Sequence, residues 1–353
     1  MRQIPMAEPI LSVRGLRTWF HQDEGIVRAV DGASFDLEPG RTLGIVGESG
    51  CGKSVTARSI LRIVERPGRV EAGEIWLRRA DGRLVDLAAL DGQGREMRAI
   101  RGGEIGYVFQ EPMSSLSAFY TIGNQLIEAV RLHADVSKRA ARARAAELLR
   151  LVGIPRPDQR VDSYSFELSG GLRQRVMIAL ALAAEPRILI ADEPTTALDV
   201  TTQAQILDLI RKLQEERDLA VILITHDMGV IAEMTDDVVV MYLGHDIEHG
   251  PVDAIFHDPK HPYTRSLLRS IPSVLAQPRS RLRTVEGSIP HPYARPQGCA
   301  FHPRCPDALA GVCDQKLPAS VALGARREAA CFLHHQGVTG ATAPVPTLLE
   351  PSP

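Results

Sequence analysis

Residues 47–54 limit the possible folds of this chain more than any other segment, because they match the pattern GxxxxGK[ST] in the setting that the pattern requires. An apolar run at 43–46, expected to be a strand, precedes them, and a helix is expected over 55–64. The glycines let successive backbone N–H groups face phosphate oxygens, the lysine supplies a positive charge, and the serine hydroxyl can ligate Mg²⁺. The residues predicted to hold the phosphates of a nucleotide are Gly47, Glu48, Ser49, Gly50, Cys51, Gly52, Lys53 and Ser54.

The alternation of short apolar runs with helical sequence gives the fold class. Strands are expected over 43–46, 105–109, 188–191, 221–225 and 238–242. Helical stretches lie between most of these runs, so we predict an α/β fold with a parallel sheet between covering helices. Residues 112–184 are mostly helical in character, with Ser137 as the N-cap of a helix over 138–151, and we interpret them as a helical insert.

Composition excludes several classes of protein. The 353 residues carry 41 Lys and Arg against 43 Asp and Glu, and this net charge of −2 argues against a nucleic-acid partner. The longest apolar run, 176–184, is far shorter than the roughly 20 residues of a membrane-spanning helix. Residues 1–8 contain no apolar stretch of the length that a signal peptide needs, so we expect a cytosolic location.

Polar side chains follow three of the expected strands, at the edge where open parallel sheets bind ligands. Asp192 and Glu193 follow the run 188–191, Gln110 follows 105–109, and His226 follows 221–225. Each residue alone is more often an ordinary turn or surface residue. Because all of them end strands of one sheet, we expect them to converge on one phosphate, with Asp192 suited to Mg²⁺ and Glu193 to a water molecule.

A second anion site is expected at the segment 168–174, which reads LSGGLRQ. Ser169, Gly170 and Gly171 start a helix, whose free N–H groups and positive dipole end attract anions. The alternative for this segment is a simple helix N-cap.

Taken together, GESGCGKS, Gln110, LSGGLRQ, ILIADE and His226 resemble the nucleotide-binding subunits of ABC transporters, over roughly residues 10–270. The resemblance implies an ABC-type P-loop ATPase fold, with a parallel sheet core, an antiparallel β subdomain and a helical subdomain at about 112–185. It also implies a head-to-tail pair of ATPase domains. Each nucleotide would then lie between the phosphate loop of one domain and the segment 169–174 of the other.

The same resemblance assigns roles to individual residues. Glu193, His226 and Gln110 are expected to be catalytic, with Glu193 orienting or deprotonating the attacking water. Gln110 is expected to join Ser54 and Asp192 near Mg²⁺ and to link the nucleotide to the permease contact. Phe20 is expected to stack on adenine, and Trp19 lies beside it in the sequence. The residues expected to contact ATP outside the phosphate loop, 47–54, are Phe20, Gln110, Ser169, Gly170, Gly171, Gln174, Asp192 and Asp199.

Three segments narrow the resemblance to the oligopeptide, dipeptide and nickel importer ATPases: 111–116 with 121–123, 261–268 and 298–306. The expected function is ATP hydrolysis that powers uptake of peptides or a related small solute, with nickel or another non-peptide solute as the alternative. The expected partners are two transmembrane permeases, a second ATPase that is identical or paralogous, and, indirectly, an extracytoplasmic solute-binding protein. The chain would lie on the cytoplasmic membrane face. Ser117-Ala118 and Ser165 depart from this family, which usually has Asn-Pro and Pro there.

Two other classes of ATPase share these motifs. DNA-repair and chromosome-organising ATPases place long coiled coils between the two motifs, but only 114 positions separate Ser54 from Leu168. ATPases that act as translation factors carry two cassettes in one chain, and this chain has a single set of motifs.

Four of the five cysteines crowd into the C-terminal part of the chain, at offsets of 6, 8 and 18 residues. In a reducing compartment Cys299, Cys305, Cys313 and Cys331 indicate metal binding. Four thiolates can hold Zn²⁺ or an iron–sulfur cluster, and the family resemblance favours [4Fe–4S]. We expect an ATPase domain over 1–270, a cysteine-containing extension over 271–336 with no direct part in ATP chemistry, and a loose tail over 337–353.

Overall fold

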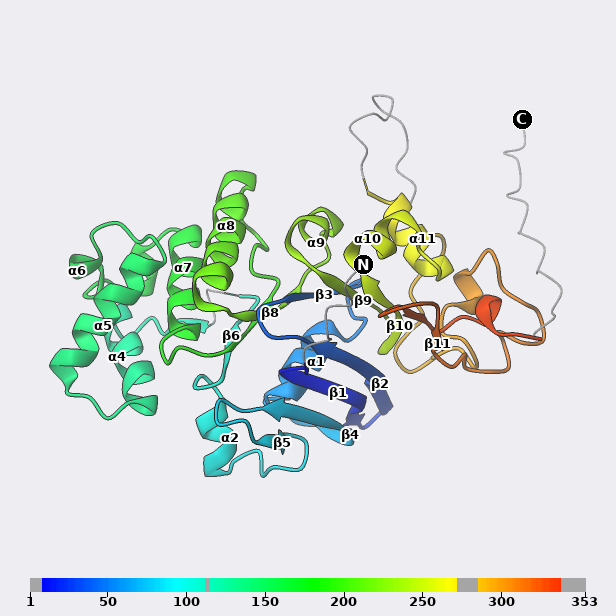
Figure 1. The fold of residues 1–353 in the computed structure, drawn as a ribbon, viewed down its shortest axis with the longest axis horizontal. Helices are drawn as coiled ribbons and strands as arrows, with labels where there is room; N and C mark the ends of the chain where they lie inside the picture. Colours follow the sequence, from blue (N-terminus) through cyan, green and yellow to red (C-terminus); the bar gives the residue numbers. More distant parts are fainter. Residues whose placement is uncertain (1–7, 112–114, 272–284, 338–353) are drawn as a thin grey trace.

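The structure is a computed structural model that describes residues 8–111, 115–271 and 285–337 (Figure 1). Most of the expected tail, and part of the expected boundary near 271, lie outside these residues. Residues 112–114 of the segment 111–116 lie outside them as well. No helix in the described ranges combines the length and apolarity needed to span a bilayer.

A central sheet confirms the predicted α/β class. Its strand order is β11-β12-β10-β9-β3-β8-β7-β6, and the pairs among β9, β3, β8, β7 and β6 are parallel. Every residue of β3, β7 and β8 is buried, as expected for strands covered on both faces. The strands are β3 (Thr42–Val46), β6 (Ile105–Val108), β7 (Ile188–Asp192), β8 (Ala220–Ile224), β9 (Asp237–Tyr242), β10 (His245–Pro251), β11 (Val321–Ala322) and β12 (Glu328–Ala329).

A second, antiparallel sheet has the order β2-β1-β4-β5. Its strands are β1 (Leu11–Gln22), β2 (Gly25–Leu37), β4 (Gly68–Arg78) and β5 (Leu84–Asp86). Side chains of β1, β2 and β4 share one apolar core with α1 (Lys53–Ile60), α2 (Arg95–Ile100) and the central sheet. This sheet therefore covers one face of the central sheet, with α1 packed in the same layer. Helix α1 ends before the expected residue 64, because Arg62 adopts a left-handed conformation with φ 53°.

Helices form the insert that the sequence predicted. Ser137 caps α5, and its hydroxyl accepts a hydrogen bond from the N–H of Ala140, as expected. Residues of the insert share a second apolar core with α8 and the other face of the central sheet. Figure 1 shows these helices at one end of the molecule. They are α4 (Ile122–His133), α5 (Lys138–Leu151), α6 (Pro157–Arg160), η1 (Ser165–Glu167) and α7 (Gly170–Ala181), followed after β7 by α8 (Val200–Arg217).

The cysteine-containing extension lies at the opposite end and is joined to the central sheet (Figure 1). Strand β12 pairs with β10 through Glu248↔Ala329 and His249↔Glu328, so the extension lengthens the central sheet. Helices α9 (Met228–Met234), α10 (Val252–His257) and α11 (Pro262–Arg269) precede it, and the short turns η2 (His302–Arg304) and η3 (Phe332–His334) lie within it.

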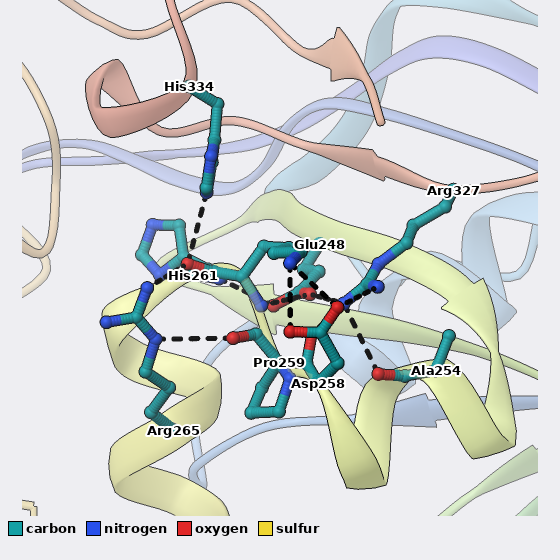
Figure 2. A network of polar contacts seen from close by, with 9 residues as sticks. Glu248, Ala254, Asp258, Pro259, His261, Arg265, Arg327 and His334 are labelled. Atoms are coloured by element: carbon teal, nitrogen blue, oxygen red, sulfur yellow. Dashed lines mark hydrogen bonds and ion pairs between the residues drawn. The ribbon is translucent and has the colours of Figure 1, made fainter. Parts of the chain in front are cut away.

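A buried polar network fastens this junction (Figure 2). The carboxylate of Glu248, on β10, accepts hydrogen bonds from the backbone N–H groups of Lys260 (2.7 Å) and His261 (2.8 Å). Arg327 of the extension pairs with Glu248 (3.4 Å) and with Asp258 (3.1 Å). Because each charge here has a partner, burial of the network is tolerated, and the extension is anchored beside α10 and α11.

Candidate nucleotide-binding site

The loop 47–54 joins β3 to α1 and folds tightly around its own lysine. Gly47 and Gly52 have φ angles of 149° and 105°, and a Cβ on either would lie 2.2 Å from a backbone oxygen, that of Met241 or Ala29. No other residue type fits at these two positions. The ammonium of Lys53 donates hydrogen bonds to the carbonyl of Gly47 at 2.8 Å and to that of Glu48 at 3.2 Å. A positive charge is therefore held at the loop.

Ser54 and Asp192 come together as the sequence predicted. The hydroxyl of Ser54 donates to Oδ1 of Asp192 at 2.9 Å, and the hydroxyl of Tyr107 donates to Oδ2 at 2.7 Å. Burial raises the pKa of Asp192, and the two hydrogen bonds oppose this shift. A hydroxyl and a carboxylate side by side are the hard oxygen ligands that Mg²⁺ takes, usually together with substrate phosphates and water.

Glu193 lies at the centre of a second polar group. Its Oε2 accepts hydrogen bonds of 2.9 Å from the amide of Gln110 and from the hydroxyl of Thr196. Nδ1 of His226 lies 3.5 Å from its Oε1. Gln110 and His226, which follow strands β6 and β8, thus both lie next to Glu193, which follows β7. The amide of Gln110 bonds to Glu193, and none of the hydrogen bonds described for Gln110 reaches Ser54 or Asp192.

Sequence reasoning missed Tyr107 and Thr196. Tyr107 lies in β6, next to β7, and its hydroxyl reaches the last residue of that strand. A buried tyrosine hydroxyl usually needs a polar partner, and that requirement was the available signal. Thr196 lies three residues after Glu193, and the turn between them brings its hydroxyl to the carboxylate.

The segment 169–174 starts helix α7 and presents its first residues to solvent. Ser169 is the N-cap but accepts no hydrogen bond through its side chain, and Ser169 and Gly170 are exposed. Gln174, also expected to contact nucleotide, is only 2% exposed. No hydrogen bond between described residues connects this segment to the loop 47–54. The exposed helix start is thus available to a group outside this chain.

Asp199 lies near that helix start and caps α8. Its carboxylate accepts hydrogen bonds from the backbone N–H (3.0 Å) and the hydroxyl (2.7 Å) of Thr202. A Cβ on Gly171 would lie 2.5 Å from Cγ2 of Thr202, so α7 and α8 pack closely at this edge. These contacts give Asp199 a structural role as an N-cap within the chain.

Two positions that depart from the family pattern contact each other. The hydroxyl of Ser165 donates to the carbonyl of Ser117 at 3.3 Å, and the guanidinium of Arg173 donates to the carbonyl of Ser165 at 2.8 Å. The side chain of Gln125 bonds to both the N–H and the carbonyl of Ser117. The chain after β6 is therefore connected through Ser165 to α7, the helix that begins at the segment 169–174.

Phe20 lies on β1 close to Val64 and Gly68. A Cβ added to Gly68 would lie 2.6 Å from the nearest atom of the Phe20 ring. Thr18, two residues earlier and therefore on the same face of the strand, bonds to Ser59 of α1. Trp19 instead has the guanidinium of Arg28 over its ring at 4.8 Å. Phe20 thus shares the strand face that α1 covers.

The four late cysteines lie near one another in the extension. The N–H of Cys299 donates to the carbonyl of Cys313 at 2.8 Å. Burial is the main cause that raises the pKa of Cys305 to about 12, and that of Cys331 to about 11, with neighbouring thiols adding to both shifts. Within the described residues, however, no three His, Cys, Asp or Glu side chains form a group that could hold a metal ion.

The extension contacts the loop 47–54, and the expectation that it takes no direct part in ATP chemistry stays a prediction. Arg304 of the extension forms an ion pair of 2.7 Å with Glu48 of the phosphate loop. This contact was not expected from the sequence, and it arises because β9, β10 and α11 fold the extension back over the end of β3.

Two family models match this chain. The model described as "ABC transporter" matches residues 30–196, and the model described as "Oligopeptide/dipeptide transporter, C-terminal region" matches residues 247–313. The two matches cover the loop 47–54 and Cys299, Cys305 and Cys313, respectively.

Relatives match over most of their length. A Brucella melitensis protein named peptide import ATP-binding protein is 47% identical over 331 residues, covering 92% of this chain and 97% of that protein. The dipeptide transport ATP-binding protein DppD of Haemophilus influenzae is 44% identical over 318 residues, covering 90% of this chain and 94% of that protein. The solved ATP-binding cassette MJ0796, a dimer bound to ADP and Pi, is 27% identical with a TM-score of 0.60, covering 69% of this chain and 98% of that chain.

Proposed function

This chain belongs to the family of ABC transporter ATP-binding proteins, and we propose that it is the ATP-hydrolysing subunit of an importer for dipeptides or oligopeptides. The observation that carries this proposal is the meeting of Ser54 with Asp192, and of Glu193 with Gln110 and His226, beside the phosphate loop. The match of residues 247–313 to the oligopeptide/dipeptide transporter region supports the class of solute. Solute selection itself belongs to the permease chains.

In the proposed mechanism each group beside the phosphate loop has one task. Lys53 and the loop N–H groups hold the phosphates. Ser54 and Asp192 would hold Mg²⁺, which would supply positive charge next to the phosphates. Glu193 orients the attacking water and accepts its proton. Its carboxylate is held in place by the amide of Gln110 and the hydroxyl of Thr196. His226, close to Glu193, stabilises charge on the transferred phosphoryl group.

A second ATPase subunit completes the site. The exposed start of α7, at Ser169 and Gly170, supplies N–H groups and the positive end of a helix to the nucleotide held by the partner subunit. Asp199 lies at the same seam. The dimeric state of the related cassette MJ0796 supports this arrangement.

A cleft beside Gln110 is a suitable contact for a permease. Its volume is about 340 Å³, and its walls come from the end of α1, strand β6 and helix α7. The large apolar and aromatic residues among its lining are Leu61, Ile63, Ile105, Tyr107, Phe109, Met177 and Leu180. Because Phe109 directly precedes Gln110, a permease segment seated here would sense the Glu193 contact. We accordingly propose that the subunit lies peripherally on the cytoplasmic face of the membrane.

We further propose that Cys299, Cys305, Cys313 and Cys331 hold a [4Fe–4S] cluster, with Zn²⁺ as the alternative. Four thiols on one segment match the ligand number of such a cluster. The backbone hydrogen bond from Cys299 to Cys313, and the packing of both in one small apolar cluster, support the proximity of these two cysteines. Zinc requires all four sulfurs within about 2.3 Å of one ion, whereas a cluster keeps its thiolates farther apart. The two alternatives therefore differ in the spacing of the sulfurs and in the metal content that they predict.

The metal proposal is tested by anaerobic purification. We expect brown protein with about four iron and four sulfide per chain. Colourless protein with about one zinc would replace the cluster with zinc, and metal-free protein would overturn both assignments.

The transport proposal is tested by isolating the chain from membranes of its own cells and identifying what accompanies it. Mass spectrometry is expected to find two permease chains, a second ATPase subunit and bound peptide. Recovery with ribosomes or DNA, and without permeases, would contradict the proposal.

A further inference from the structure

Two distant parts of the chain hold Glu48, the second residue of the phosphate loop. Its carboxylate accepts two hydrogen bonds from the guanidinium of Arg304, at 2.7 Å to Oε2 and 3.0 Å to Oε1. Its backbone N–H donates to the hydroxyl of Tyr263 at 2.9 Å. Tyr263 and Arg304 are 215 and 256 positions away from Glu48. The backbone of this loop residue is therefore held by α11, and its side chain is held by the extension.

Arg304 is built into its position. Its side chain is only 4% exposed, and that of Glu48 is 22% exposed. The remaining donors of the guanidinium reach the hydroxyl of Tyr242 (3.2 Å) and the carbonyls of Glu286 (2.9 Å) and Val285 (3.4 Å). A paired, planar contact of this kind fixes both the distance and the orientation of the carboxylate.

Aromatic packing joins the two segments that supply these contacts. The ring of Tyr263 lies 4.7 Å from that of Tyr242 and 5.3 Å from that of Phe301, and His261 lies 5.9 Å from Phe301. His261 and Tyr263 come from 261–268, and Phe301 comes from 298–306. Both segments narrowed the family resemblance in the sequence analysis, and the proposed mechanism of ATP hydrolysis uses neither of them.

We propose that Arg304 is a positioning residue of the ATP site, through which the C-terminal extension sets the affinity for ATP. The inference rests on the proposed role of the phosphate loop in binding ATP. The triphosphate is strongly negative, and Glu48 adds a carboxylate to the loop that must receive it. Paired with Arg304, this carboxylate is neutralised and held away from the phosphates. Unpaired and partly buried, it would repel ATP with little screening by salt.

The fold explains why the extension is needed for this contact. Arg304 is the last residue of the turn η2. Its backbone N–H donates to the carbonyl of Phe301 at 2.9 Å, and the N–H of Cys305 donates to the carbonyl of His302 at 3.2 Å. Cys299 and Cys305 flank this turn. Arg304 therefore reaches Glu48 only when the cysteine-containing segment is folded.

The test compares ATP binding by the full chain and its variants by calorimetry. Arg304→Ala is expected to weaken ATP binding about tenfold, equivalent to about 1.4 kcal/mol. In hydrolysis assays the KM for ATP should rise while kcat at saturating ATP is unchanged. Arg326→Ala is the matched control. Arg326 joins the same extension to Asp237, the first residue of β9, at the end of the strands away from the loop 47–54. This variant should bind ATP like the wild type.

A second substitution separates repulsion from a loss of folding. In the double variant Glu48→Gln with Arg304→Ala, the repelling charge is gone, so ATP affinity should return toward the wild-type value. Arg304→Lys keeps the charge but loses the paired geometry, and it should lie between wild type and Arg304→Ala even if the alanine variant does not fold. Equal affinity of wild type and Arg304→Lys or Arg304→Ala would overturn the proposal, as would equal losses in Arg304→Ala and Arg326→Ala. Failure of the wild type to bind ATP would instead overturn the proposed function.

Discussion

The hydroxyl of Ser54 donates a hydrogen bond of 2.9 Å to Oδ1 of Asp192, across 138 positions of sequence. Ser54 stands in the first turn of α1 and Asp192 at the end of β7, and the central sheet brings the two elements together. The two oxygen atoms that we propose as ligands of Mg²⁺ are thus in contact within the chain itself. The predictions below follow from this preformed pair and from its surroundings.

Ser54→Ala removes one of the two proposed oxygen ligands and leaves the carboxylate of Asp192. We expect the Mg²⁺ concentration for half-maximal ATP hydrolysis to rise about tenfold to a hundredfold. Ser59→Ala is the matched control, because Ser59 lies on the same helix but bonds to Thr18, away from Asp192. Titration of hydrolysis with Mg²⁺ checks the prediction, and an unchanged requirement in Ser54→Ala would contradict it.

Tyr107→Phe removes a hydrogen bond that stabilises the ionised form of Asp192. Burial already raises the pKa of Asp192, so losing this bond should raise it further. In the proposed mechanism only the ionised carboxylate would hold Mg²⁺, so activity should fall as pH falls through this pKa. The acid limb of the pH–rate profile should therefore move to higher pH in Tyr107→Phe. It should stay in place in Tyr120→Phe, whose side chain is exposed. Identical acid limbs in all three proteins would refute the coupling.

Gly170→Asp places a negative charge at the exposed start of α7. A Cβ at Gly170 would meet only Leu198, at an ordinary 3.7 Å, so the fold should tolerate the change. The isolated variant should bind ATP like the wild type, since its own phosphate loop is untouched. In the assembled transporter, hydrolysis at the partner's nucleotide should fall sharply, because the aspartate repels the phosphates there. Weakened ATP binding by the isolated chain would argue against a site shared between subunits.

The sequence predicted the parts of the site that follow directly from local pattern. Gln110, Glu193 and His226 each end an apolar run, and parallel strands bring such ends to one edge. The cap at Ser137 and the limits of α5 followed from short-range rules as well. Strands β11 and β12 have two residues each, too few to show a periodicity, and they were not predicted.

Contacts between distant segments were the part that the sequence could not supply. The pairing of Arg304 with Glu48 depends on how α11 and the extension pack over the end of β3, and no local pattern encodes that packing. The network around Glu248 and Arg327 has the same origin (Figure 2). Tyr107 was missed for a related reason, because its hydroxyl matters only once β6 lies beside β7.

The account is tested most directly by Glu193→Gln in the transporter assembly purified through this chain. Wild-type and variant assemblies are compared for subunit composition, ATP binding and ATP turnover. We expect equal composition and equal ATP binding, because glutamine can keep a hydrogen bond to Thr196. Turnover should fall by about 10²- to 10⁴-fold, because the amide cannot accept the proton of the attacking water. A variant assembly that hydrolyses ATP at the wild-type rate would contradict the account.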